Sequence, residues 1–123
     1  MLKEDFFIHS SVRRILVRSN IDSTKIEFGT VRGVVYFRGL FQLTRVYVYD
    51  DDELNRYLKS QDFIRKTLTS FEKKVRELPG VKDVVFQLVN WNKEKGQWRP
   101  MESKKKVQGY GQEDDSNVSK DFE

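Results

Sequence analysis

The sequence contains no cysteine and only one histidine, and these absences exclude several kinds of chemistry. Without cysteine, the chain can form neither a disulfide nor a thiolate zinc site. The sequence also lacks a glycine-rich phosphate loop and a serine in a nucleophile elbow. We therefore expect no catalytic residue, no cofactor and no metal, and we expect His9 to be structural or exposed to solvent.

No apolar run in the sequence is long enough to span a bilayer. The first residues also lack the basic segment and the long apolar segment of a secretory signal. A full-length chain of this kind is expected in the cytoplasm, whereas a fragment of an exported precursor would belong to the periplasm or the envelope. The sequence leaves the localisation open between these two.

The length of 123 residues suits one domain, because two separate cores would each be small. Hydrophobic residues make up only 37% of the chain and charged residues 34%, so part of the chain is expected not to fold. The apolar periodicity ends after Trp91, and residues 104–106 and 113–115 form runs of opposite charge. We predict a folded domain over residues 1–91 and a disordered charged tail over residues 92–123.

A first helix is predicted over about residues 5–19. Asp5 is placed to cap its first amides, and Asn20 with Asp22 would end it. The apolar residues with the spacing of one buried helix face are Ile8, Val12, Ile15 and Leu16.

A β-hairpin is predicted after this helix. Residues 25–28 alternate charged and apolar side chains, as in a half-buried strand, and residues 34–41 are rich in β-branched and aromatic side chains. Residues 32–33 supply the turn between the two strands. The alternation persists through residues 42–49, so the second strand either ends before this stretch or continues into an unusually long arm.

Apolar residues recur with a helical, heptad-like spacing over residues 54–78. One long helix would satisfy this pattern, and so would two helices that break near residues 60–62; residues 62–78 are helical in both cases. Pro79 and Gly80 end the helix. A third strand is then predicted over residues 81–91, where apolar residues alternate again.

Four acidic residues stand together at positions 50–53. Oxygen ligands of this kind can bind Mg²⁺ or Ca²⁺, but the run lacks the ligand spacing and the glycine of a calcium loop. Carboxylates at the start of a helix commonly cap it and favour its dipole. We interpret this run as a helix cap and not as a metal site.

These elements predict an α+β fold with the order α-β-β-α-β. One face of a three-stranded sheet is expected to pack against both helices, and the strand order is left open. The candidates for the buried core are Val35, Phe37, Phe71, Val75, Val84, Phe86 and Leu88.

Two segments resemble motifs of the BON domain family. Residues 33–41, GVVYFRGLF, are similar to that family's G-x-V-x-L-x-G-x-V hairpin, and residues 78–88, LPGVKDVVFQL, are similar to its helix-to-strand junction. The resemblance covers about residues 8–90, although Phe86 stands where the family usually has Asn and residues 43–61 exceed the usual link. It implies a non-catalytic binding module that associates with anionic phospholipid or other envelope components.

Phe7, Arg14 and Arg18 form a second stripe, on the far side of the first helix. An aromatic ring beside two arginines suits a phosphate-rich surface, so these three residues are the candidates for binding an anion or a lipid. The alternative is an ordinary solvated face with one partly covered phenylalanine.

Residues 42–61 form an arm or insertion between the second strand and the second helix. Its part 42–58 carries more apolar and aromatic residues than a fully solvated segment needs. We predict that it either folds over the open face of the sheet or contacts a protein, including a second copy of this chain. The candidates for the protein contact are Val46, Tyr47, Val48, Tyr49 and Tyr57.

Two alternatives stay open for the function. The long arm is similar to the ring-building domains of secretion systems, which implies oligomerisation in a secretion or envelope assembly. The other is a weak, nonspecific grip on nucleic acid, which the net charge of +4 would permit. The sequence lacks the GXXG loop of KH domains and the stacking pattern of RRM domains, so we do not expect nucleic acid as the main partner.

Overall fold

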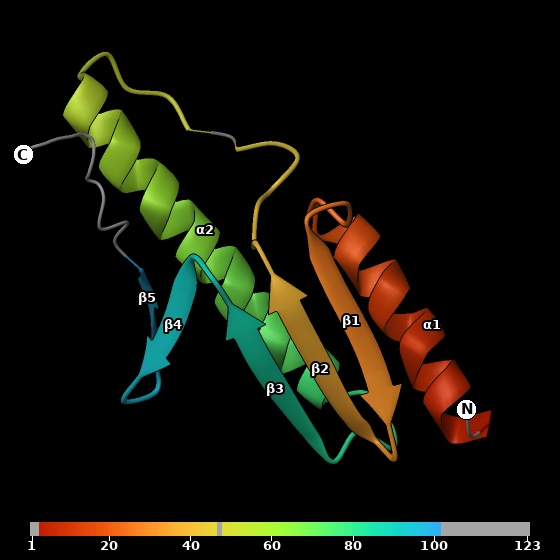
Figure 1. Cartoon of the computed structure of the whole chain (residues 1–123). Helices are drawn as coiled ribbons and strands as arrows, with labels where there is room; N and C mark the ends of the chain where they lie inside the picture. Colours follow the sequence, from red (N-terminus) through yellow and green to blue (C-terminus); the bar gives the residue numbers. More distant parts are fainter. Residues whose placement is uncertain (1–2, 47, 102–123) are drawn as a thin grey trace, which may run out of the picture.

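The computed structural model describes residues 3–46 and 48–101, and this part of the chain contains two helices and five strands (Figure 1). The predicted α+β fold is confirmed, and the first five elements have the predicted order. In chain order the elements are α1 (Lys3–Arg18), β1 (Ile26–Val31), β2 (Val34–Gly39), α2 (Glu53–Arg76), β3 (Asp83–Leu88), β4 (Trp91–Glu94) and β5 (Gln97–Pro100).

The strands β1, β2 and β3 form one sheet in that order. β1 runs antiparallel to β2, with Ile26 opposite Gly39. β3 runs parallel to β2, because α2 carries the chain back along the sheet before β3 begins. β3 ends at Leu88, short of the predicted end at Trp91. Both helices lie on one face of this sheet, as predicted (Figure 1).

The hydrophobic core lies between that face and the two helices. Phe86 is only partly buried, but its ring stacks on Phe37 with the centroids 5.0 Å apart. Phe37 also meets the ring of Phe71 edge-on at 5.1 Å, so an aromatic cluster joins α2 to β2 and β3. The other predicted core residues are all buried, namely Val35, Val75, Val84 and Leu88.

α1 buries its predicted stripe except for Ile15, which is partly buried, but Asp5 does not cap the helix. Because α1 already begins at Lys3, Asp5 lies inside its first turn, and the side chain is buried. The Asp5 carboxylate accepts hydrogen bonds from the backbone N–H groups of Arg32 and Gly33, each at 2.9 Å. Asp5 thereby fastens the turn between β1 and β2 to α1. Packed against the core on the stripe are Ile8, Val12, Ile15 and Leu16.

α2 is one continuous helix from Glu53 to Arg76, without a break near residues 60–62. The Asp52 side chain accepts a hydrogen bond from the Asn55 backbone N–H at 3.2 Å, so the predicted acidic cap is confirmed. Gly80 has a φ of 89°, a left-handed conformation that lets the chain leave the helix and turn directly into β3.

β2 ends at Gly39. The possible continuation of this strand through residues 42–49 is not found in the described part of that stretch. Gly39 has a φ of 119°, and the chain turns out of the sheet there. The Thr44 backbone N–H then donates to the Asn20 carbonyl at 2.7 Å. This segment therefore bonds to the connection between α1 and β1 instead of extending the hairpin.

Residues 92–100 belong to a second hairpin, which corrects the prediction that a disordered tail begins at residue 92. β4 pairs antiparallel with β5. Trp91 and Trp98 anchor the hairpin, and each side chain is only 4% exposed. Apolar periodicity did not predict this hairpin, because its buried side chains are two tryptophans that form no alternating apolar pattern. The rest of the predicted tail, residues 102–123, lies outside the described residues.

Candidate interaction surfaces

The N-terminal end of α2 extends beyond the three-stranded sheet (Figure 1). A 24-residue helix is about 36 Å long, whereas a six-residue strand spans about 20 Å. Residues 51–59 are all exposed, so neither the sheet nor α1 buries this end of the helix. We call residues 51–59 the α2 overhang.

Three large apolar side chains of the α2 overhang are exposed to solvent. Leu54 is 63% exposed, Tyr57 is 58% exposed and Leu58 is 54% exposed. Tyr49 is 83% exposed, and its hydroxyl donates to Asp51 Oδ1 at 2.7 Å, which holds its ring near the start of the helix. We call the side chains of Tyr49, Leu54, Tyr57 and Leu58 the overhang surface.

Neighbouring groups hold the acidic residues at the start of α2. Lys59 Nζ donates to Asp50 Oδ2 at 2.7 Å, and the Arg56 guanidinium donates to the Asp50 backbone carbonyl at 2.8 Å. The hydrogen bond from Lys59 holds the pKa of Asp50 below its usual value. Within the described ranges, no group of three or more acidic or histidine side chains is placed to hold a metal ion. These contacts brace the overhang as a helix.

The five residues predicted to contact a protein fall into three groups: those that are exposed, one that is partly buried, and one that lies outside the described residues. Val48 is partly buried, and Tyr47 lies outside the described residues. Leu54 and Leu58 belong to the overhang surface and lie within the predicted interaction segment 42–58. Neither was named as a contact residue, because their spacing continues the stripe that is buried farther along α2. The candidates that the structure exposes are Val46, Tyr49 and Tyr57.

The outer side of α1 carries the predicted anion-binding stripe. Phe7 is 59% exposed, and Arg14 and Arg18 are also exposed. Phe6, which the stripe did not include, is 58% exposed, and the centroids of the Phe6 and Phe7 rings are 6.2 Å apart. α1 therefore presents two aromatic rings at its N-terminal end and two arginines farther along. Neither α1 nor α2 is long and apolar enough to cross a membrane.

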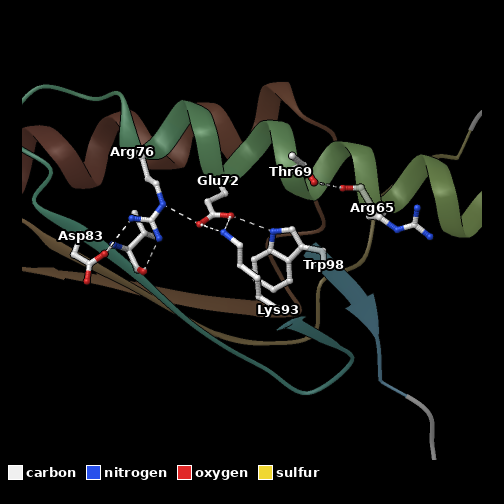
Figure 2. A network of polar contacts seen from close by, with 8 residues as sticks. Arg65, Thr69, Glu72, Arg76, Asp83, Lys93 and Trp98 are labelled. Carbon is white, nitrogen blue, oxygen red and sulfur yellow. Dashed lines mark hydrogen bonds and ion pairs between the residues drawn. The ribbon is translucent and has the colours of Figure 1, made fainter. Parts of the chain in front are cut away.

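A buried carboxylate, Glu72 of α2, is the centre of a polar network that the sequence did not indicate (Figure 2). Glu72 accepts hydrogen bonds from Arg76 Nε at 2.8 Å, from Lys93 Nζ at 2.8 Å and from Trp98 Nε1 at 3.1 Å. Arg76 also pairs with Asp83 at 3.0 Å. The network thus joins α2 to β3 and to the β4–β5 hairpin.

The geometry of this network suits a structural role. Burial alone would raise the pKa of Glu72, but hydrogen bonds from Lys93 and Arg76 outweigh it and hold the pKa below its usual value. Both carboxylate oxygens already accept hydrogen bonds. An ionised, fully paired carboxylate is poorly suited to exchange protons with a substrate near neutral pH. We therefore assign Glu72 a structural role, in which it holds the β4–β5 hairpin against α2.

His9 packs at the edge of the core. Its ring stacks on Phe28 with the centroids 4.3 Å apart, and an Arg13 guanidinium nitrogen lies 3.2 Å from Nε2. Burial, and then the charge of Arg13, lower the pKa of His9. A catalytic histidine is usually oriented by an acceptor such as a carboxylate. The group beside Nε2 of His9 is instead the Arg13 cation.

The two segments that resemble BON motifs meet in space. A Cβ atom placed on Gly33 would approach the Gly80 carbonyl oxygen at 2.7 Å. The Lys82 backbone N–H donates to the Gly33 carbonyl at 2.8 Å.

Comparisons with protein-family models, curated proteins and solved structures find no match. The resemblance to BON domains stays a prediction that rests on the two motifs.

Proposed function

We propose that this chain is a non-catalytic interaction module that binds a protein partner through the overhang surface. The observation that carries the proposal is the exposure of all nine residues 51–59, in which no side chain is buried by the rest of the described chain. Leu54, Tyr57 and Leu58 each expose more than half of their surface there. Contiguous apolar patches exposed on a folded protein commonly mark a contact with another protein or with a membrane.

The overhang suits docking because its backbone is already formed. Asp52 caps the helix, and the ion pair between Lys59 and Asp50 braces its first two turns. A partner therefore meets a preorganised surface, which costs less conformational entropy than ordering a loop. Tyr49 and Tyr57 add large contact areas with few rotatable bonds.

Photo-crosslinking in the cells that produce the protein tests this proposal. We expect benzoylphenylalanine in place of Tyr57 to form an adduct with one defined protein. The same group in place of Val89, which is 63% exposed just after β3, should form none. Adding Leu58→Asp should remove the Tyr57 adduct without unfolding the chain, because Leu58 is itself half exposed. No adduct from position 57, or equal adducts from both positions, would overturn the proposal.

A second candidate function is binding of an anionic lipid surface through α1. The exposed Phe6 and Phe7 rings favour it, since aromatic side chains insert readily at a membrane interface. Arg14 and Arg18 would add electrostatic attraction of about 1 kcal/mol each near an anionic surface. The BON resemblance implies the same class of partner.

Co-sedimentation with vesicles tests this second candidate. We expect binding to phosphatidylglycerol vesicles but not to phosphatidylcholine vesicles, with an affinity that falls as salt rises. Arg14→Glu combined with Arg18→Glu should abolish binding, whereas Leu58→Asp should leave it unchanged. Retention of RNA or DNA at physiological salt without any vesicle binding would favour the nucleic-acid alternative instead.

A further inference from the structure

The overhang surface is complementary to itself when two copies of α2 run in opposite directions. Asp51 lies seven residues before Leu58, and Arg65 lies seven residues after it. Seven residues are close to two helical turns, so Leu58 and Arg65 lie on nearly the same side of α2. Asp51 lies just outside the helix, two residues before Glu53. An acidic group therefore precedes the apolar centre, and a basic group follows it two turns later.

We infer that the partner on the overhang surface is a second copy of this chain, paired antiparallel about a two-fold axis beside Leu58. The inference rests on the proposed function and names its partner. Each Leu58 then faces Leu58 of the second copy, and Leu54 and Tyr57 pack around this contact. Both copies use the same patch, so the contact is complete in a closed dimer.

The charges favour antiparallel pairing over parallel pairing. Parallel helices would bring the acidic residues 50–53 of the two copies together, and like charges across an interface repel each other. Antiparallel helices instead bring Asp51 of each copy to Arg65 of the second copy. The two-fold axis makes this ion pair twice, once at each end of the apolar contact.

Both charged groups can form this contact without breaking a buried interaction. The Arg65 side chain is 44% exposed, and its ion pair with Asp62, at 3.1 Å, is a surface pair of the kind that contributes little. Asp62 also pairs with Lys66 at 3.1 Å and keeps that partner when Arg65 moves. The Tyr49 hydroxyl donates to Asp51 Oδ1. The other carboxylate oxygen of Asp51 can accept a hydrogen bond from Arg65 of the second copy.

Sedimentation velocity of the full chain, from about 1 μM to about 1 mM, tests the inference. We expect the wild type to pass from monomer to dimer within this series. Leu58→Asp should raise the dissociation constant by at least about thirtyfold, because it places two carboxylates at the centre of the contact. The matched control Val89→Asp, on a side chain of similar exposure, should change nothing.

A charge reversal tests the antiparallel arrangement separately. Asp51→Arg and Arg65→Asp should each weaken the dimer by roughly tenfold, because each places two like charges opposite one another twice. The double variant restores both ion pairs with their signs exchanged. Its dissociation constant should therefore return to within about threefold of the wild-type value.

The possible outcomes separate the inference from the proposed function. A wild type that stays monomeric across the series overturns the inference, and a Tyr57 adduct with a different protein would then leave the proposed function standing. A dimer that Leu58→Asp does not weaken also overturns the inference, because the copies then meet through another surface. A double variant no tighter than Asp51→Arg or Arg65→Asp alone overturns the antiparallel pairing.

Discussion

Replacing Glu72 by glutamine should destabilise the attachment of the β4–β5 hairpin to α2 (Figure 2). Glutamine keeps the volume of the side chain and can still accept a hydrogen bond, but it removes the charge that faces Arg76 and Lys93. The Glu72 side chain is only 7% exposed, whereas those of Arg76 and Lys93 are 43% and 39% exposed. The two cations can therefore return to water, which limits the loss.

The structure sets the expected magnitude and provides a matched control. A hydrogen bond to a charged group contributes about 1.5–3 kcal/mol, and the partial exposure of both cations reduces the sum, so we expect Glu72→Gln to lower the free energy of unfolding by about 2–3 kcal/mol. Asp62 also holds two cations, Arg65 and Lys66, each at 3.1 Å, but its side chain is 46% exposed. Asp62→Asn should therefore cost less than about 0.5 kcal/mol.

Urea denaturation followed by tryptophan fluorescence measures both changes. Trp91 and Trp98 are both buried and both belong to the hairpin, so the emission reports the element that Glu72 fastens. A loss for Glu72→Gln no larger than that for Asp62→Asn would refute the reasoning, because burial would then not strengthen the network.

Three further changes test the network and the packing. The folded state holds the pKa of Glu72 below its usual 4.5, so the unfolded chain takes up the proton first; in urea melts, the stability advantage over Glu72→Gln should be full above pH 4.5 and shrink below it. Phe71→Ala should cost about 3–5 kcal/mol in the same melts, and a loss under about 1 kcal/mol would contradict full burial of the ring. In thermal melts Gly33→Ala should cost about 1–3 kcal/mol, because its φ is 84° and a Cβ would strike Gly80, whereas Gly29→Ala, with no atom within 4 Å, should cost nothing measurable.

The main core could be predicted from periodicity because the residues that form the apolar pattern are the same residues that pack between the sheet and the helices. Val35 and Phe37 alternate on β2, Phe71 and Val75 are one turn apart on α2, and all four are fully buried. The continuity of α2 was not predictable in this way. Residues 60–62 carry no apolar side chain, so the pattern there did not distinguish a surface turn from a break.

The Glu72 network could not be predicted because its partners are distant in the sequence. Lys93 and Trp98 lie 21 and 26 residues after Glu72, and only the fold brings them together. A glutamate in a charged helix has the pattern of a solvated residue. The short β4–β5 hairpin was missed for a related reason, since its strands of four residues carry charged side chains around two tryptophans.

The overhang surface depends on relative lengths that the sequence pattern does not contain. Leu54 and Leu58 continue the apolar stripe of α2, so periodicity placed them with the buried residue Leu68. They are exposed because α2 is longer than the strands it covers (Figure 1). The aromatic content of residues 42–58 did indicate an interaction segment, but the exposed side chains gather at the start of the helix.

Disulfide trapping is the most direct test of association through the overhang surface. The natural chain has no cysteine, so a single introduced thiol reports one position. Leu58→Cys places the thiol beside the inferred two-fold axis, and Val89→Cys places it at a site of similar exposure, 63% against 54%. Under mild oxidation we predict a covalent dimer that forms much faster with Leu58→Cys than with Val89→Cys. Equal rates for the two variants, or faster linkage through position 89, would contradict association through this surface.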